Sequence, residues 1–199
     1  MHAPTDIKTA ALELKGGGAV IFPTDTVYGL GIAIDSSATP DVLYELKGRA
    51  QDKPIAWLVG DESDLLRYGS AVSKLSCALA HAFWPGPLTL VVKASDAVPA
   101  PFRSFAGTIG LRMPANPCAL SLVREVGCPL ATTSANISGQ RAVYTFEDLD
   151  KGLLSAVSAS VCDDSPKSGL ASTVLDCTGD YPHVLRQGAI TIAQIQALM

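Results

Sequence analysis

Short apolar runs alternate along the chain with segments in which apolar residues recur every three or four positions. The first helical segment is expected to follow Thr5, to place Ile7 and Leu14 on one apolar face, and to end at the glycines of residues 16–18. Between the first two predicted strands, residues 23–31 are expected to form a turn-rich connection. The pattern predicts short strands over residues 19–22, 55–59, 88–93, 108–112, 130–133, 159–162, 173–176 and 183–186.

Further helices are indicated by their start and stop residues. Thr39 and Pro40 suit the cap and the first position of a helix, and residues 117–126 form another that opens on proline. Helical spacing over residues 72–83 predicts a helix that the Pro-Gly-Pro of residues 85–87 ends in a packed corner. Helices are also expected near residues 146–157 and 191–198, with a loop over residues 99–105.

The alternation of strands and helices indicates the fold class. It continues over the whole chain and is typical of a layered α/β domain. With 199 residues and no internal repeat, low-complexity tract or linker, the chain is expected to form a single domain over residues 1–199. Hydrophobic residues make up 48% of the chain, which is ample for a substantial core.

The charge balance disfavours one class of function. Charged residues make up 17% of the chain, against about a quarter in typical soluble domains. The formal net charge of -4 gives no support for strong nonspecific nucleic-acid binding, which usually shows as a basic excess. The 15 lysines and arginines can still gather in a local basic cavity.

Cysteine spacing and the absence of targeting patterns suggest the compartment. The five cysteines are an odd number without a C-x-x-C pair, and no histidine lies at ligand spacing from one of them, so no zinc or other resident metal site is expected. Neither a signal-peptide pattern nor an apolar run of about 18 residues is present. We therefore expect a soluble, cytoplasmic protein.

Two polar segments in the first half of the chain carry candidate chemistry. Residues 23–31 read P-T-D-T-V-Y-G-L-G, and their hydroxyls and backbone N–H groups can bind a small polar ligand, although an ordinary turn explains the same composition. Three cations follow at Lys47, Arg49 and Lys53. They suit phosphate binding, because arginine supplies a planar fork and lysine a point charge. A lysine at a helix C-terminus is also favoured by the helix dipole alone.

The second half carries further candidates. Arg112 ends a predicted strand, and ligands of open α/β sheets gather at the carboxyl ends of strands. Ser134 and Asn136 lie two residues apart, so in extended backbone they face the same side. A solvated arginine and a Ser/Thr-rich turn are the respective alternatives. The segments around Ser172 and Arg186, taken alone, indicate only strands with polar ends.

Known catalytic patterns are missing from the sequence, but the motifs as a set resemble one family. We find no Ser-His-Asp order, P-loop, dinucleotide-binding glycine pattern or paired catalytic carboxylates, so the chemistry would use cations and hydroxyls. Seven motifs follow one another over about residues 16–190: P-T-D-T-V-Y-G-L-G, K-G-R, F-W-P-G-P-L-T, R-M-P, S-A-N-I-S-G, S-T-V-L-D and L-R-Q-G. In this order they resemble the YrdC family of threonylcarbamoyl-AMP synthases.

The resemblance implies a fold and a reaction. The fold would be a three-layer α/β domain of the short, single-domain type, with a twisted mixed sheet and a concave basic cavity. In the implied reaction L-threonine captures bicarbonate or carbon dioxide as a carbamate, which attacks the α-phosphorus of ATP and releases pyrophosphate. The chain would thus be a nucleotidyltransferase that uses Mg²⁺ with ATP. Its product would pass to proteins that transfer the threonylcarbamoyl group to tRNA.

The resemblance also assigns residues to roles. Lys47 and Arg49 would be catalytic. The nucleotide would be bound by Lys47, Arg49, Lys53, Arg112, Ser134, Asn136 and Arg186. Threonine would be bound by Thr26, Asn116, Ser134 and Ser172.

The chain departs from the family pattern at four positions. Relatives often carry His at the positions of Leu58 and Asn116, Glu at Ala171 and Pro at Gln187. These departures bear on the threonine contacts and not on the nucleotide site.

Two other functions stay open. A basic concavity could hold duplex RNA or tRNA, for example in ribosome maturation, although the net charge of -4 weakens this reading. The chain could also be a carbamoyl-adenylate enzyme of another pathway, like the related domain of hydrogenase maturation proteins. That domain normally accompanies others.

Overall fold

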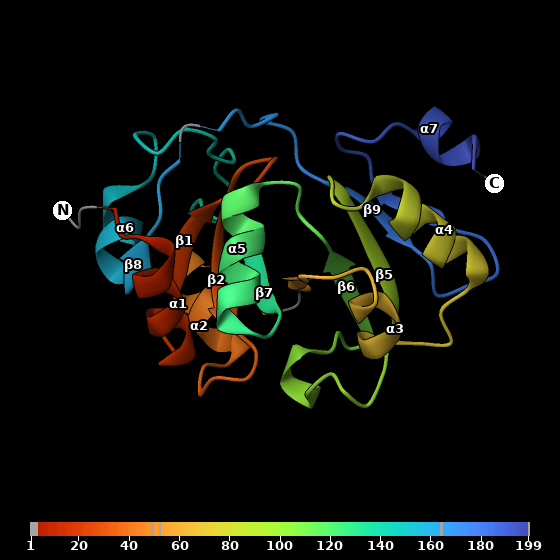
Figure 1. Ribbon diagram of the computed structural model, residues 1–199, viewed down its shortest axis with the longest axis horizontal. Helices are drawn as coiled ribbons and strands as arrows, with labels where there is room; N and C mark the ends of the chain where they lie inside the picture. Colours follow the sequence, from red (N-terminus) through yellow and green to blue (C-terminus); the bar gives the residue numbers. More distant parts are fainter. Residues whose placement is uncertain (1–3, 49, 52, 164, 199) are drawn as a thin grey trace.

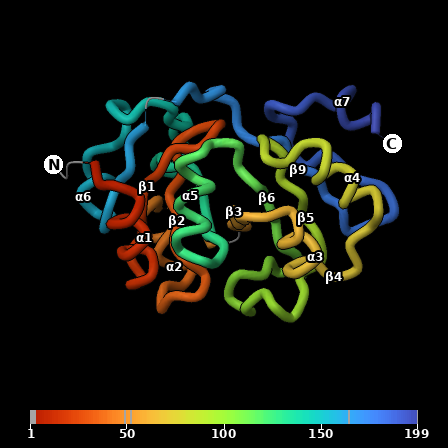
Figure 2. The backbone as a smooth tube through the Cα atoms, in the orientation of Figure 1, coloured from red at the N-terminus to blue at the C-terminus, as the bar shows by residue number. Residues whose placement is uncertain are grey.

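The computed structural model describes residues 4–48, 50, 51, 53–163 and 165–198. The chain ends lie at opposite ends of the long axis of the molecule (Figure 2). The helices are α1 (Ile7–Lys15), α2 (Pro40–Lys47), α3 (Asp64–Tyr68), α4 (Lys74–Phe83), α5 (Pro117–Val126), α6 (Lys151–Ala156) and α7 (Ile192–Gln196), with a 3-10 turn η1 (Ala100–Phe102). The strands are β1 (Val20–Pro23), β2 (Tyr28–Ala33), β3 (Ala56–Leu58), β4 (Gly69–Ser70), β5 (Leu88–Ala94), β6 (Thr108–Arg112), β7 (Leu130–Ser134), β8 (Ala159–Ser160), β9 (Thr173–Asp176) and β10 (His183–Arg186).

These strands form one twisted, mixed sheet with helices packed beside it (Figure 1). Their order is β10-β9-β5-β6-β3-β7-β2-β1-β8, and β4 pairs with β5. The pairs β3–β6, β5–β9 and β1–β8 are parallel, whereas β5–β6, β2–β7 and β9–β10 are antiparallel. The predicted α/β class with a mixed sheet is confirmed. Because neighbours in this order are often distant in sequence, residues from the whole chain meet on one face of the sheet.

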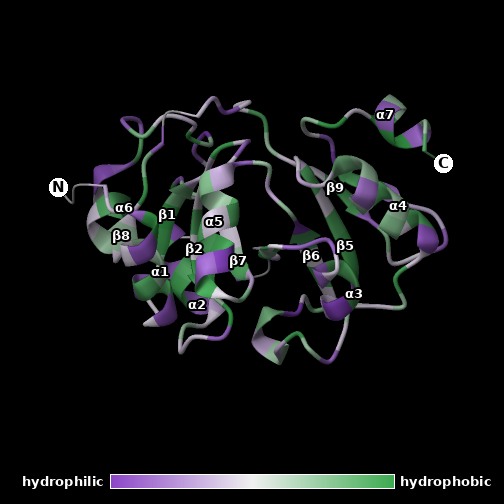
Figure 3. Cartoon of the chain, in the orientation of Figure 1, coloured by the Kyte–Doolittle hydropathy of each residue, from purple (hydrophilic) through white to green (hydrophobic). Residues whose placement is uncertain are grey.

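Large aromatic side chains fill the centre of the molecule. Phe22, Tyr28 and Trp57 are fully buried, and the Trp57 ring meets Tyr68 and Phe102 edge to face at centroid distances of 5.2 and 5.6 Å. Each buried aromatic removes roughly 150–250 Å² from water. In Figure 3 the strands β1, β2 and β5 are coloured mainly as hydrophobic. This core holds the sheet rigid beneath the side chains on its polar face.

Helix boundaries follow capping side chains. Asn116 caps α5, whose predicted bounds are confirmed. The helix predicted over residues 146–157 was too long, because Asp150 accepts a hydrogen bond from the Leu153 N–H and starts α6 only there. At α1 the cap is Asp6 and not Thr5, whose hydroxyl instead donates to the Ser160 carbonyl. Among the described residues, none of these helices has the length and the apolar character that a membrane span needs.

The strand β2 was missed by the sequence analysis, and the turn predicted over residues 23–31 is confined to residues 24–27. All six residues of β2 are buried, and the strand pairs with both β1 and β7. Its glycines make room for the Phe22 ring, since a Cβ on Gly31 would come within 2.9 Å of it. Glycine there serves a close approach of a ring to the backbone, as it does in other strands. By contrast, the strands predicted over residues 108–112, 173–176 and 183–186 are confirmed.

Candidate functional site

A cavity of about 1320 Å³ lies on one face of the sheet. Alternate residues of its strands line it, as the two-residue period of a strand requires. On β6 these are Thr108, Gly110 and Arg112, whereas Ile109 and Leu111 between them are buried in the core. The described lining residues include four cations and two carboxylates, the cations being Lys93, Arg103, Arg112 and Arg186 and the carboxylates Asp41 and Asp176. The cavity is therefore locally basic in a chain whose net charge is -4.

The first polar group of the site is the Lys47 cluster, which comprises Lys47, Ser134 and Asn136. Lys47 is 2% exposed at the end of α2, where Gly48 turns the chain in the left-handed conformation. Its ammonium donates to the Ser134 backbone carbonyl, and at 3.3 Å to both Ser134 Oγ and Asn136 Oδ1. The Asn136 amide donates in turn to the carbonyls of Ile137 and Gln140. Ser134 and Asn136 line the cavity, so Lys47 fixes them from behind.

The second group is the Arg112 cluster, which comprises Arg112, Asp25 and Thr26. Arg112 Nη2 donates to Asp25 Oδ1 at 2.6 Å, Nη1 donates to Thr26 Oγ1 at 3.0 Å, and Nε donates to the Gly86 carbonyl at 3.0 Å. The guanidinium side chain is 8% exposed. Burial lowers the pKa of Arg112, and the Asp25 carboxylate opposes that shift. The guanidinium nevertheless stays charged at neutral pH, as arginine does throughout proteins.

The loop between β1 and β2 carries Thr26 into the cavity. The hydroxyls of Thr24 and Thr26 lie 2.9 Å apart, and Thr24 Oγ1 donates to the Val27 carbonyl. Both threonines are buried and both line the cavity. The hydrogen bonds close the loop on itself, so the Thr26 hydroxyl has a fixed position before any ligand arrives.

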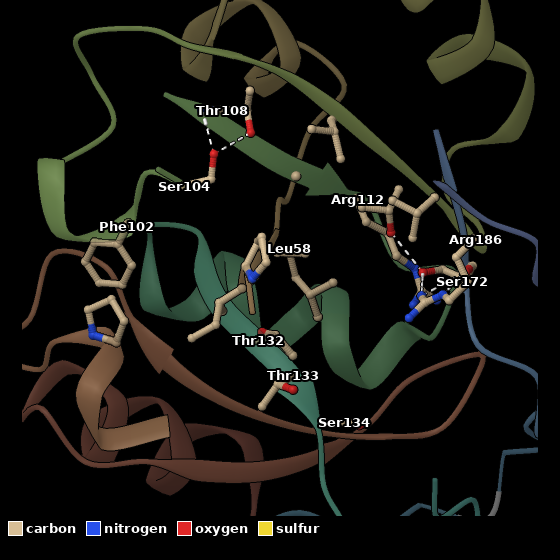
Figure 4. A pocket seen from close by; sticks show the side chains of 18 of the residues that line it. Leu58, Phe102, Ser104, Thr108, Arg112, Thr132, Thr133, Ser134, Ser172 and Arg186 are labelled. Carbon is tan, nitrogen blue, oxygen red and sulfur yellow. Dashed lines mark hydrogen bonds between the residues drawn. The ribbon is translucent and has the colours of Figure 1, made fainter. Parts of the chain in front are cut away.

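The third group joins Arg186 to Ser172 and Thr89. Arg186 donates through Nε and Nη2 to the Ser172 carbonyl, at 3.2 and 2.9 Å, and through Nη2 to Ser172 Oγ at 3.1 Å. The Ser172 hydroxyl lies 2.9 Å from Thr89 Oγ1. All three residues line the cavity, and Figure 4 shows Arg186 beside Ser172. The positive charge of Arg186 also lowers the pKa of Arg112, so the two guanidinium groups act on one region.

The structure brings most of the predicted site residues to this cavity. Thr26, Arg112, Ser134, Asn136, Ser172 and Arg186 line it. Lys47 supports the wall from behind, and Lys53 is not among the described lining residues, although its carbonyl accepts the Tyr44 hydroxyl at 3.1 Å. Arg49 lies outside the described residues.

Asn116, predicted to contact threonine, has a structural position instead. It is 3% exposed and is not among the described residues that line the cavity. Its carboxamide oxygen accepts from the Ala119 N–H to cap α5, and its amide donates to Asp163 Oδ2 at 2.9 Å. Both ends of the side chain are thus engaged with the fold, which is why we assign it no ligand contact.

Asp163 links Asn116 to the cavity loop indirectly. It pairs with Lys167 at 2.8 Å, and the backbone N–H groups of Ser168 and Gly169 donate to the carbonyls of Asp25 and Thr26. Burial raises the pKa of Asp163, but hydrogen bonds led by Lys167 and Asn116 outweigh burial and hold that pKa below its ordinary value. The segment after β8 therefore fastens the loop that carries Thr26.

Sequence reasoning gave no role to several residues that the structure places in the site. Asp25 lies in a segment that was singled out, but its pairing with Arg112 joins residues 87 positions apart. Thr89 belongs to the segment that the sequence analysis interpreted as a packed corner. That corner is present in the structure, where Trp84 Nε1 donates a hydrogen bond to the Leu88 carbonyl. Only strand order brings Thr89 beside Ser172, because β5 and β9 are parallel neighbours.

Comparison with known proteins agrees with this geometry. The family model Sua5_yciO_yrdC, described as "Telomere recombination", matches residues 13–188. The threonylcarbamoyl-AMP synthase of Bacillus subtilis is 38% identical over 97% of this chain and 56% of its own length. A putative threonylcarbamoyl-AMP synthase of Mycobacterium leprae is 36% identical over 97% of this chain and 87% of its own.

A solved structure is similar over the same span. The crystal structure of Pyrococcus abyssi Sua5 complexed with L-threonine superposes with a TM-score of 0.89 at 32% identity, covering 97% of this chain and 57% of that one. The chain thus spans a little over half the length of the Bacillus and Pyrococcus relatives. The family match, the identities and the shared fold together establish that the chain belongs to the Sua5/YciO/YrdC family.

Proposed function

We propose that this chain is an L-threonylcarbamoyladenylate synthase, a nucleotidyltransferase that uses L-threonine, bicarbonate or carbon dioxide, and ATP. One observation carries the proposal: a single basic cavity gathers Ser134 and Asn136 of the Lys47 cluster, Arg112 and Thr26 of the Arg112 cluster, and Arg186 with Ser172. These groups suit one anionic nucleotide beside one amino acid. The names of the relatives support the same activity.

The proposed chemistry has two bond-forming steps. The threonine amine attacks carbon dioxide, loses a proton and becomes a carbamate. Starting from bicarbonate, that proton leaves together with the displaced hydroxide as one water molecule. A carbamate oxygen then bonds to the α-phosphorus of ATP while the bond from that phosphorus to the bridging oxygen breaks and pyrophosphate leaves. Such transfers need positioning and charge stabilisation more than covalent help. A cavity of cations and hydroxyls meets that need.

We assign the nucleotide to Ser134 and Asn136 on one side of the cavity and to Arg186 on the other. Arg49 and Lys53, which follow α2 in the sequence, are proposed to contribute to the same nucleotide site. Arginine donates to phosphate oxygens through a planar fork, and its charge is permanent. Lys47 would act here by holding Ser134 and Asn136 in place, since its ammonium already donates to both. Fixed donors lower the barrier because they need no reorganisation when negative charge develops on the phosphate oxygens.

We assign threonine to Thr26 and Ser172, whose hydroxyls line the cavity beside Arg112 and Arg186. The Pyrococcus relative with bound L-threonine supports an amino-acid site in this fold. Arg112 donates to Thr26 Oγ1, so we place its guanidinium between the two substrates and not with the nucleotide alone. The side chain of Leu58 lines the cavity where relatives often carry histidine, which makes this part of the site more apolar.

Magnesium would enter the cavity on the phosphates of ATP. Within the described parts of the chain, no three His, Cys, Asp or Glu side chains gather as a metal cage. A cation that the nucleotide carries needs no such cage, because Mg²⁺ keeps several waters and binds phosphate oxygens well. The adenylate product would then be passed to proteins that modify tRNA.

Pyrophosphate release tests the proposal. We expect release only when ATP, magnesium, L-threonine and bicarbonate are all present, with the loss of any one abolishing it. Arg49→Ala should lower catalytic efficiency by about 2–4 kcal/mol of transition-state stabilisation, and Arg67→Ala on α3 serves as a matched control. Well-folded protein that releases no pyrophosphate in response to threonine would exclude the synthase reading.

A further inference from the structure

The rim of the cavity carries an exposed aromatic side chain that the proposed chemistry leaves without a role. Residues 100–106, between β5 and β6, all line the cavity, and we call them the rim segment. Phe105 within it is 94% exposed, the highest value among the large hydrophobic side chains that the structure describes. A single exposed aromatic side chain is common on protein surfaces. Ligand cavities, however, are lined mainly by hydrophobic and aromatic side chains, so the place of Phe105 at the rim makes it a candidate ligand contact.

The turn that presents Phe105 is tightly held. The Gly107 N–H donates to the Ser104 carbonyl at 2.9 Å, and the Ser104 N–H donates to the Thr108 carbonyl at 2.9 Å. Ser104 Oγ accepts from the N–H groups of Ala106 and Thr108, and lies 2.7 Å from the Thr108 hydroxyl. Gly107 has a φ of +69°, a conformation that favours glycine. The phenyl ring thus projects from a fixed backbone.

The rim segment is also anchored to the core at its other end. Phe102 is 9% exposed and packs edge to face on Trp57. Arg103 Nε donates to the Val98 carbonyl at 2.8 Å, and Val98 itself is fully buried. One aromatic side chain of the segment therefore fastens it, while the second borders the cavity and stays exposed. This division suits a preformed ligand contact, because little ordering is needed when the ligand binds.

The cavity has two chemically different ends. Figure 4 shows Phe102 and Ser104 at the end away from Arg112 and Arg186. The rim segment supplies Pro101, Phe102 and Phe105 at its end, whereas the other end presents guanidinium groups and hydroxyls. A nucleoside triphosphate has the same polarity, with an aromatic base at one end and anionic phosphates at the other.

We propose that Phe105 is the stacking platform for the adenine ring of ATP, and that the rim segment positions the base while the cationic wall holds the phosphates. The inference rests on the proposed function and extends it by naming a base contact. Stacking of a base on an aromatic ring is worth roughly a 5- to 150-fold change in affinity on alanine substitution. A phenyl ring offers no hydrogen bonds, so it would favour any purine over a pyrimidine by stacking area alone.

The test compares ligands with and without a base. Binding of ATP, AMP and inorganic tripolyphosphate is measured by calorimetry for the wild type, Phe105→Ala, Phe105→Trp and the control Tyr181→Ala. Tyr181 is 70% exposed and is not among the described residues of the cavity. We expect Phe105→Ala to weaken ATP and AMP about tenfold or more, to leave tripolyphosphate within about twofold, and to be rescued by Phe105→Trp.

Each other outcome has a definite meaning. If the wild type binds ATP and Phe105→Ala binds it equally well, the base contact is overturned while the proposed function stands. Equal weakening of ATP and tripolyphosphate by Phe105→Ala overturns it as well, since the ring would then act on the whole cavity. A wild type that binds neither ATP nor AMP overturns the proposed function and the base contact together.

Discussion

Two arginines reach the same cavity, but the fold holds them in different ways. Arg112 lies on the central strand β6, is 7% exposed, and donates to Asp25, Thr26 and the Gly86 carbonyl. Arg186 ends the edge strand β10, whose four residues are all exposed, and donates to Ser172. A buried ion pair binds separate parts of a fold together, whereas an exposed cation contributes little to stability. Arg112 is thus expected to serve both fold and chemistry, and Arg186 chemistry alone.

The largest effect is expected from Arg112→Ala. Removing the guanidinium leaves the Asp25 carboxylate, whose side chain is 17% exposed, without its cation. We expect the free energy of unfolding to fall by about 3 kcal/mol and activity to be lost. Urea denaturation measures the first and pyrophosphate release the second.

A double-mutant cycle with Asp25→Ala isolates the pair. The stability losses of the two single variants should add up to more than the loss of the double variant. The difference, which is the coupling energy of the pair, should be about 2 kcal/mol. Additive losses would mean that the ion pair does not join β6 to the loop between β1 and β2, and the contrast with Arg186 would disappear.

Arg186→Ala should separate chemistry from stability. We expect kcat/KM for ATP to fall roughly 30-fold, about 2 kcal/mol, because the donor that we propose for the phosphates is removed. The melting temperature should stay within about 1 °C of the wild type, since exposed groups seldom carry much stability. A drop in melting temperature as large as that of Arg112→Ala would show that both arginines are structural.

The smallest effect is expected from Gly188→Ala, which tests how the backbone places Arg186. A Cβ at Gly188 would lie 2.1 Å from the Ala171 carbonyl oxygen, so the end of β10 must move away from Ser172. We expect a loss of about 1–2 kcal/mol in stability and a few-fold loss of kcat/KM. The matched control is Gly179→Ala, where a Cβ meets no atom within 4 Å. Equal behaviour of the two variants would mean that the contact of Arg186 with Ser172 does not depend on this close approach.

Local patterns in the sequence were sufficient for many elements of the fold. Residues 108–112, 117–126 and 173–176 have the bounds that their apolar spacing and turn residues predict, because period and capping are local properties. The set of ordered motifs also indicated the family, which the comparisons establish. The individual roles of Thr26, Ser134 and Arg186 stay predictions, although the structure brings these residues to one cavity.

Other features depend on contacts between distant segments. The sequence alone suggested a turn at the glycines of β2, because the Phe22 ring that explains them lies on another strand. It assigned Asn116 to threonine, because the bond that engages Asn116 with Asp163 joins residues 47 positions apart and cannot be seen in the local sequence. It gave Asp25 and Phe105 no role, since pairing with Arg112 and exposure at a cavity rim exist only after folding. The sequence by itself determined the family, the class of fold and the kinds of side chain available. Strand order and packing decided which of them meet, because those are long-range contacts that no local pattern encodes.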